Sequence, residues 1–264
     1  MDLQLSGKRA LVTGSTAGID WAIACELAAE GAHVTLNGRD PARVAAALER
    51  LRAQVPGATV HGVAADLATA AGCQALLDAA PEQDILVNNL GIFEPKAFEQ
   101  ITDADWLRFF EVNVLSGVRL ARHYLGRMQA RGWGRVVFIS SESGICPPGD
   151  MVHYGMSKSA QLSVSRGLAE TCAGTGVTVN SVLPGPTRTE GAVDFFTTLA
   201  RNAGQTLQEA EADFFKHARP TSLLQRFIEP VEVAAMVAYV CSPRAAATNG
   251  AALRVEGGVV RSLI

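Results

Sequence analysis

The chain has 264 residues, a formal net charge of −3 and a hydrophobic fraction of 48%. A nucleic-acid-binding domain normally carries a basic excess, and the sequence holds no run of about twenty apolar residues that could cross a bilayer. We therefore expect neither a nucleic-acid nor a membrane partner. The five scattered cysteines, and an N-terminus without the basic-then-apolar layout of a secretion signal, predict a cytoplasmic protein with reduced thiols. Its dispersed histidines predict no metal site.

Short apolar runs alternate with helix-length segments along the whole chain. The runs that predict buried strands are residues 8–13, 32–37, 59–64, 84–87, 135–140, 177–183 and 251–255. The segments that predict helices are residues 21–30, 40–54, 70–79, 103–131, 151–172 and 230–241. This alternation predicts a single α/β domain over residues 1–264, with a doubly wound parallel sheet of about seven strands and helices on both faces.

A turn with two glycines connects the first expected strand to the first expected helix. Gly14 permits a tight turn, and Gly18 lets the backbone approach an anion at the helix N-terminus, where free N–H groups favour negative charge. This context is typical of a dinucleotide site. Asp20 departs from the pattern, which has a third glycine there. Either its carboxylate faces solvent as a first-turn acid, or it faces the pyrophosphate and weakens binding; the sequence leaves both interpretations open, and we expect weakening.

The end of the second expected strand indicates the type of nicotinamide cofactor. A carboxylate at this point would bind the adenosine ribose and repel a 2′-phosphate, but the residues are Asn37, Gly38 and Arg39. Arg39 can pair with a phosphate and stack on adenine, which predicts NADP(H), with NAD(H) as the alternative if Arg39 is only a solvated turn residue. Asp66, after the third strand, is expected to accept a hydrogen bond from the adenine amine.

Polar groups also follow the fourth and sixth expected strands. Residues 88–91, Asn-Asn-Leu-Gly, come directly after a buried strand, at the edge where open parallel sheets bind ligands. Pro184 and Gly185 end the sixth strand, and the hydroxyls of Thr187 and Thr189 follow at the expected place of a nicotinamide amide. Residues 190–226 contain aromatic pairs and no strand, which predicts a helical lid over the substrate.

Three side chains between residues 141 and 158 offer acid–base chemistry. Tyr154 and Lys158 lie one helical turn apart, so their side chains share a face. A nearby ammonium favours a phenolate and is expected to lower the pKa of Tyr154, which allows proton exchange with a carbonyl or an alcohol. Ser141 follows the fifth strand and can hydrogen-bond the same substrate oxygen. Asn113 is expected inside its helix, either as a satisfied core residue or in a proton path.

Together these motifs resemble the short-chain dehydrogenase/reductase family over nearly the whole chain. The matching positions are Thr13-Gly14-x-x-x-Gly18-Ile19, Asn88-Asn89-Leu90-Gly91, the tetrad Asn113, Ser141, Tyr154 and Lys158, and Pro184-Gly185. The resemblance implies a Rossmann-like fold and cofactor contacts from Gly14, Ser15, Thr16, Gly18, Ile19, Arg39, Asp66, Leu67, Asn89, Leu90, Gly91, Tyr154, Lys158, Pro184, Gly185, Thr187 and Thr189. Asp20 replaces the last motif glycine, and Leu90 replaces the usual alanine.

The resemblance also implies a role for each member of the tetrad. Tyr154 would be the general acid in carbonyl reduction and the base in alcohol oxidation, while Ser141 would orient and polarise the carbonyl. Lys158 would lower the pKa of Tyr154 and hold the nicotinamide ribose hydroxyls, and Asn113 would seat a water that links Lys158 to solvent. Family members are commonly tetramers, so a homotetramer or a homodimer is implied, with the apolar C-terminal tail at a subunit interface.

The leading interpretation is an NADP(H)-preferring oxidoreductase that reduces a ketone or oxidises a secondary alcohol. A 3-oxoacyl thioester, a sugar or a cyclic ketone would each suit it, and the apolar segments 92–98, 144–152 and 190–226 favour a moderately hydrophobic ketone. One alternative is an NAD-dependent alcohol, sugar or steroid-type dehydrogenase. Another is a nucleotide-binding homologue that Asp20 has left catalytically impaired.

Overall fold

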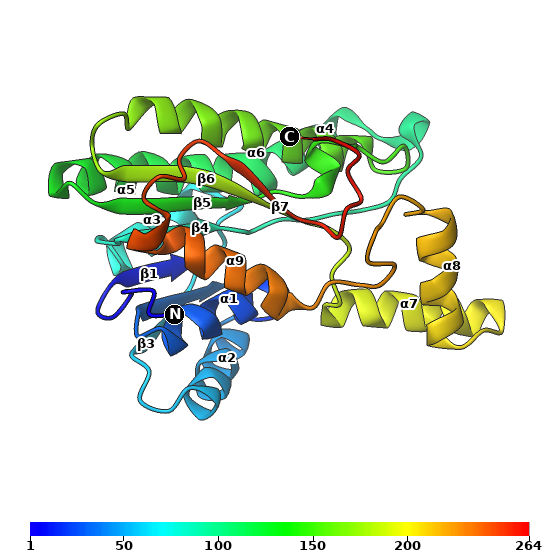
Figure 1. Ribbon diagram of the computed structural model, residues 1–264, viewed down its shortest axis with the longest axis horizontal. Coiled ribbons are helices and arrows are strands. Elements are labelled where there is room, and N and C mark those ends of the chain that lie inside the picture. Colours follow the sequence, from blue (N-terminus) through cyan, green and yellow to red (C-terminus); the bar gives the residue numbers. More distant parts are fainter. Residues whose placement is uncertain (264) are drawn as a thin grey trace.

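Seven parallel strands form one sheet in the order β3-β2-β1-β4-β5-β6-β7 in the computed structural model, which describes residues 1–263 (Figure 1). The strands are β1 Arg9–Val12, β2 His33–Gly38, β3 Val60–Ala64, β4 Ile85–Asn88, β5 Gly134–Ile139, β6 Val177–Pro184 and β7 Ala252–Val255. Every neighbouring pair is parallel. The predicted α/β fold with its parallel sheet is confirmed, and the strand order reverses between β1 and β4, which is where ligands bind in such sheets.

Helices cover both faces of this sheet. They are α1 Gly18–Ala29, α2 Pro41–Gln54, α3 Ala70–Ala79, α4 Asp103–Phe110, α5 Ser116–Arg131, α6 Val152–Thr171, α7 Glu190–Ala203, α8 Leu207–His217 and α9 Pro230–Cys241. Successive strand side chains point to opposite faces, so Val12 joins a core with α1 and α9, while Leu11 joins a core with α3 and α5. The result is the doubly wound arrangement that alternating strands and helices predict.

The helix predicted over residues 103–131 is not regular throughout. A π-turn, Glu111–Leu115, separates α4 from α5 and contains Asn113. Such turns insert an extra residue into a helix and are frequent at functional sites. The predicted helical range is found, and the π-turn inside it was not predicted. The turn places Asn113 where its amide reaches the loop after β4.

Residues 190–226, here called the lid, lie beyond the carboxyl ends of the strands (Figure 1). Helices α7 and α8 begin at the N-caps Thr189 and Thr206, whose hydroxyls accept backbone N–H bonds. A small apolar core of their own, which includes Phe196 and Phe215, holds them together. The lid is thus a folded helical unit, separate from the two cores of the sheet.

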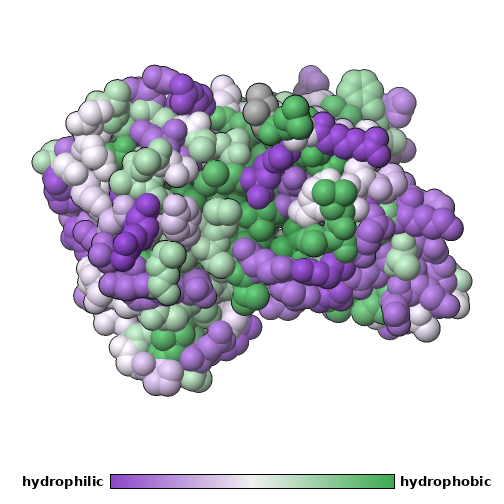
Figure 2. All heavy atoms as spheres, viewed as in Figure 1, coloured by the Kyte–Doolittle hydropathy of each residue, from purple (hydrophilic) through white to green (hydrophobic). Residues whose placement is uncertain are grey.

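The segment after β7 returns toward the lid. The carbonyl oxygen of Gly257 accepts from the N–H of Leu223 at 2.7 Å, and that of Val259 accepts from the hydroxyl of Thr221 at 2.6 Å. Figure 2 shows apolar side chains in the hollow between the sheet and the lid on this face. Among residues 1–263, no helix has the length and apolar character needed to span a membrane.

Candidate active site

Two cavities lie along the carboxyl ends of the strands and together contain most of the predicted site. The larger, about 840 Å³, is lined by Gly18, Ile19, Asn89, Gly91, Ser141, Tyr154, Lys158, Pro184, Gly185, Thr187 and Thr189. The smaller, about 530 Å³, is lined by Gly14, Thr16, Arg39, Leu67 and Leu90. Ser15, Asp66 and Asn113 are the predicted site residues that line neither cavity.

The glycine turn has the backbone conformation that its sequence requires. Gly14 and Gly18 have φ values of 70° and 64°, in the left-handed region that glycine enters readily. The side chain of Asn37 accepts from the N–H of Gly14 at 3.3 Å, and the hydroxyl of Ser15 donates to the carbonyl of Val12 at 2.7 Å. The buried side chain of Ser15 therefore stabilises the turn from inside, and its contact with a cofactor stays a prediction.

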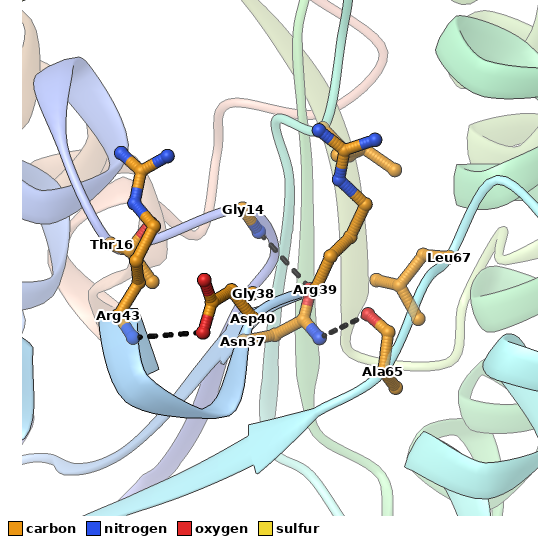
Figure 3. Close-up of a pocket in the computed structure, with 10 residues that line it drawn as sticks. Gly14, Thr16, Asn37, Gly38, Arg39, Asp40, Arg43, Ala65 and Leu67 are labelled. Carbon is orange, nitrogen blue, oxygen red and sulfur yellow. Dashed lines mark hydrogen bonds between the residues drawn. The ribbon is translucent and has the colours of Figure 1, made fainter. Parts of the chain in front are cut away.

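The smaller cavity presents two arginines. Figure 3 shows the side chains of Arg39 and Arg43 extending from the end of β2 and the first turn of α2, on opposite sides of the pocket. Both are exposed, and neither forms an ion pair within residues 1–263. Two free guanidinium groups suit a phosphate monoester. Arg43, in the first turn of α2, was not among the predicted site residues.

Asp66 does not enter the smaller cavity, although its neighbours Ala65 and Leu67 line it. Its side chain is exposed and accepts from the N–H of Ala68 at 3.2 Å. This local bond is typical of an aspartate in a turn and could not be distinguished from ligand binding in the sequence. The predicted contact with adenine remains a prediction.

The tetrad residues come together from three segments: Asn113 from the π-turn, Ser141 from the loop after β5, and Tyr154 and Lys158 from α6. Lys158 is buried, and its Nζ atom donates to the carbonyl of Ile139 at 2.9 Å and lies 5.7 Å from the centre of the Tyr154 ring. Ser141 follows β5 and begins a short 3₁₀ turn, Glu142–Gly144. A Cβ atom on Gly91 would lie 3.5 Å from both the Asn113 Oδ1 and the Lys158 Nζ atoms, so these two groups flank one point of the loop after β4.

Asn113 is bonded to protein groups on all sides of its amide. Its Oδ1 atom accepts from the N–H of Ile92 at 2.8 Å, and its Nδ2 atom donates to the carbonyl of Ile92 and to the hydroxyl of Ser157. The backbone carbonyl of Asn113 accepts from the Nε2 atom of Gln161 at 2.6 Å. These bonds hold the loop after β4 against α6, which favours the satisfied-core interpretation of Asn113; its role in a proton path stays a prediction.

Burial controls the protonation of the two central groups. Desolvation raises the pKa of Tyr154 above its usual value, although the Ser141 hydroxyl opposes this, and desolvation lowers the pKa of Lys158 to about 8. The sequence predicted that Lys158 would lower the pKa of Tyr154. In this structure the pKa of Tyr154 is raised instead, because desolvation outweighs the lowering by the Ser141 hydroxyl and the Arg219 guanidinium; the effect of Lys158 on the phenol stays a prediction. Tyr154 is consequently protonated at neutral pH and suited to donate a proton.

Asp20 faces the larger cavity and not bulk solvent. Its Oδ1 atom is inaccessible and has no hydrogen-bond partner within residues 1–263, and its Oδ2 atom lies 3.4 Å from the position of a Cβ atom on Gly14. Burial raises the pKa of Asp20 well above its usual range, and the charge of Lys158 partly offsets the increase. The solvent-facing interpretation is therefore wrong.

A second carboxylate lies at the same turn. Glu190, the first residue of α7, accepts from the backbone N–H of Gly18 at 3.0 Å through its Oε2 atom. This N–H is one of the donors that the sequence assigned to a pyrophosphate. The two ends of the cleft, at Arg39 and at Tyr154, suit the two ends of a dinucleotide. Between them, the pyrophosphate would meet the acidic side chains of Asp20 and Glu190.

Replacing Asp20 with asparagine is expected to tighten NADPH binding by about tenfold, or ~1.4 kcal/mol. Asparagine keeps the shape of the side chain and removes a charge that would repel the pyrophosphate. Because only the ionised carboxylate repels and burial raises its pKa, the gain should be larger at alkaline than at acidic pH. Titration of the purified wild type and variant with NADPH, followed by nicotinamide fluorescence, measures the affinity at each pH. Equal affinity of the wild type and the variant at both pH values would contradict this account.

The pKa of Lys158, lowered to about 8, predicts a second pH effect on binding. Below this value the amine is charged and can hold a dinucleotide; above it the charge is lost, so affinity should fall as the pH rises from about 7 to about 9. The Asp20→Asn variant separates the two causes, because it retains Lys158. Its affinity should still fall in this range, and a flat profile would show that Lys158 does not contribute.

Comparisons with known proteins agree with this geometry. Residues 8–200 match the short chain dehydrogenase family. The chain is 52% identical to an uncharacterized oxidoreductase, YvaG, of Bacillus subtilis over the full length of both proteins. It is 32% identical to the 3-oxoacyl-[acyl-carrier-protein] reductase of Aquifex aeolicus, over 98% of this chain and 100% of that protein.

Among solved structures, the L-sorbose reductase of Gluconobacter frateurii, complexed with NADPH and L-sorbose, superposes with a TM-score of 0.94. It is 31% identical in sequence, and each chain is covered completely. The family match spans most of the chain, and the tetrad and the glycine turn meet at one cleft. The chain therefore belongs to the short-chain dehydrogenase/reductase family and is an oxidoreductase of carbonyl or alcohol substrates.

Proposed function

We propose that this oxidoreductase prefers NADP(H) and reduces an uncharged ketone, with Tyr154 as the proton donor. The observation that carries the proposal is the position of Tyr154, whose half-buried phenol lines the larger cavity together with Ser141 and Lys158, and desolvation there raises the pKa of the phenol. A phenol that keeps its proton at neutral pH is suited to reduction, because reduction ends with a proton on the substrate oxygen.

The chemistry follows from the positions of these groups. NADPH, when bound, supplies the hydride to the carbonyl carbon. Tyr154 gives its proton to the carbonyl oxygen as that oxygen gains negative charge, and Ser141 lies beside the phenol to hold the same oxygen. Lys158, fixed by the carbonyl of Ile139, places positive charge near the developing oxyanion and lowers the barrier to its formation. In alcohol oxidation, Tyr154 would accept the proton instead.

The preference for NADP(H) is supported by Arg39 and Arg43. Their guanidinium groups flank the smaller cavity (Figure 3), where an adenosine 2′-phosphate would lie if the nicotinamide were beside Tyr154. The L-sorbose reductase with the same fold was solved with NADPH. An NAD-dependent enzyme remains the alternative, and it would gain nothing from these two arginines.

The charges around the larger cavity support an uncharged substrate. The cations that line it are Arg43, which also lines the smaller cavity, and Lys158, whose Nζ atom is already bonded to the carbonyl of Ile139. Its acids are Asp20, Glu190 and Asp194. A substrate carboxylate or phosphate would meet this acidic side without a free cation in the described lining, and its desolvation would be uncompensated.

Aromatic and apolar groups support the ketone class. Phe93 is 69% exposed at the cavity, and its ring packs edge-on against Tyr154 at 6.5 Å. An exposed phenylalanine beside the reacting phenol gives a ketone apolar surface to cover. There are two alternative substrate classes. A sugar, such as the L-sorbose bound by the structural neighbour, is more polar, and an acyl thioester, as the Aquifex relative's name indicates, is longer.

A second candidate is a dinucleotide-binding homologue with impaired catalysis. The observation that favours it is Asp20, whose unpaired Oδ1 atom is buried at the cofactor turn. Binding and turnover separate the two candidates, because an impaired homologue would bind NADPH weakly and consume none with any ketone.

A panel of carbonyl compounds tests the proposal through consumption of NADPH and of NADH. We expect the fastest turnover with neutral ketones such as ethyl acetoacetate or cyclohexanone, slower turnover with their carboxylate counterparts such as acetoacetate, and NADPH preferred to NADH. Absence of turnover with every ketone, or a preference for the carboxylates, would contradict the proposed substrate class.

The proposal includes a homotetramer or homodimer. Leu107 and Phe110 are 68% and 39% exposed on α4, and Leu263 is fully exposed in the C-terminal segment. Apolar side chains in such positions are typical of subunit interfaces. Light scattering during size-exclusion chromatography would give the mass in solution, and a monomer at micromolar concentration would contradict this part of the proposal.

A further inference from the structure

A buried carboxylate directly follows the serine of the tetrad. Glu142 is 5% exposed, and its Oε2 atom accepts the hydroxyl hydrogen of Ser141 at 2.5 Å. The N–H of Ser143 donates to the same hydroxyl oxygen at 3.1 Å. A serine hydroxyl has one hydrogen to donate, so Glu142 controls the direction in which Ser141 can act.

The lid supplies the countercharge for this carboxylate. The Nε and Nη2 atoms of Arg219 both donate to the Oε1 atom of Glu142 at 3.3 Å, across 77 residues of sequence. Arg219 follows α8, and its side chain is 19% exposed and packs against the ring of Phe214 in the lid. The pair is therefore largely shielded from solvent, and it connects the lid to the loop that carries Ser141.

The two oxygens of Glu142 have different partners, and this determines the chemistry. Oε2 competes with a substrate carbonyl for the hydrogen of Ser141. Arg219 draws negative charge toward Oε1, which weakens Oε2 as an acceptor and makes that hydrogen available. Without Arg219, a buried carboxylate would remain uncompensated beside the oxygen that becomes negative during reduction.

We propose that Glu142 and Arg219 are a charge-balanced pair of positioning residues, which orients the Ser141 hydroxyl and makes this orientation depend on the contact between the lid and the serine loop. The inference rests on the proposed carbonyl chemistry for its kinetic effects. The connection between the lid and the serine loop does not depend on that chemistry, so it can be tested separately.

The charges on both residues also act on Tyr154. The Glu142 carboxylate raises the pKa of the phenol and the Arg219 guanidinium lowers it. Lys158, on α6, feels both Asp20 and Glu142. A role limited to packing would not give opposite effects for the two members of one ion pair, so the pH profile distinguishes positioning from simple structural support.

The kinetic test uses Glu142→Gln, Arg219→Gln and the double variant, with the best alcohol and ketone from the panel. In oxidation, which needs the phenolate, the pH of half-maximal rate should move down by about half a unit or more in E142Q and up by a similar amount in R219Q. The double variant should return near the wild type. R219Q should also lose about 10- to 100-fold in kcat with a small change in KM. Shifts in the same direction, or none, would overturn the proposal.

A hydrogen-exchange test needs no substrate. With NADPH bound, amides of residues 190–226 should exchange faster in both E142Q and R219Q than in the wild type, because the ion pair no longer holds the lid. Lys216→Gln is the matched control: it removes an exposed cation from the last turn of α8, just before Arg219, and should leave exchange unchanged. Wild-type exchange in both variants would overturn the link to the lid. If no ketone is turned over, the proposed function fails while this result still stands.

Discussion

Tyr154→Phe is expected to reduce turnover by a factor of about 10³ or more while NADPH binds as in the wild type. General acid catalysis by a positioned group typically contributes ~10²- to 10⁴-fold, and phenylalanine removes only the oxygen that carries the proton. The ring, its edge contact with Phe93 and the helix around it remain. Steady-state reduction of the best ketone gives the rate, and fluorescence titration gives the affinity for NADPH.

Two controls make this result specific. Tyr239→Phe removes a hydroxyl from a half-exposed tyrosine on α9, far in sequence from the tetrad, and should keep full activity. Ser141→Ala should lose less than Tyr154→Phe, because it removes the group that orients the carbonyl and leaves the proton donor. Turnover in Tyr154→Phe within tenfold of the wild type would contradict the role of the phenol.

Arg39→Ala and Arg43→Ala are each expected to weaken NADPH binding by about 10- to 100-fold and to leave NADH binding nearly unchanged. A hydrogen bond to a charged group contributes ~1.5–3 kcal/mol, and only NADPH carries the 2′-phosphate. Titrations of each variant with both cofactors give the change in selectivity. The double variant should bind NADPH and NADH about equally.

Arg52→Ala is the matched control for these variants. Arg52 lies in the last turn of α2, the helix that carries Arg43, where it is exposed and pairs with Glu49. Its loss should change the affinity for neither NADPH nor NADH. Equal losses of NADPH and NADH in Arg39→Ala would show that this residue contacts a part that both cofactors share. That result would favour the NAD-dependent alternative.

The fold was predictable because local patterns and the global arrangement agree. Short apolar runs such as residues 84–87 cannot form helices, and caps such as Asp40-Pro41 mark helix starts. The exception was the turn around Asn113. The π-turn was not predictable from local sequence, because Asn113 is held by partners that are distant in the chain, Ile92 and Ser157.

The site was only partly predictable, since side-chain direction depends on distant partners. Ser15 and Asp66 matched a family pattern, yet the structure uses both side chains in local bonds. Arg43 was missed because nothing in the sequence distinguishes it from other solvated helix positions. The direction of the pKa of Tyr154 depends on burial by several elements, which the spacing to Lys158 does not report.

Two acidic side chains lie at the glycine turn, and one of them, Asp20, departs from the pattern that the chain otherwise resembles. Asp20 replaces a glycine, and Glu190 accepts the N–H of Gly18. A pyrophosphate must approach both, so we expect the lid residue Glu190 to move when a dinucleotide binds. Movement of Glu190 and repulsion between Asp20 and the pyrophosphate both cost free energy. This cost would appear as weaker binding of NADPH and of NADH.

Transfer of deuterium from labelled NADPH tests the central claim most directly. Wild-type protein, the best neutral ketone and NADPH deuterated at the transferring position of C4 should give an alcohol with one deuterium on the carbinol carbon. Tyr154→Phe should bind the same NADPH and give almost none. Deuterium in the alcohol at similar rates from both proteins, or none from the wild type with any ketone, would contradict the account.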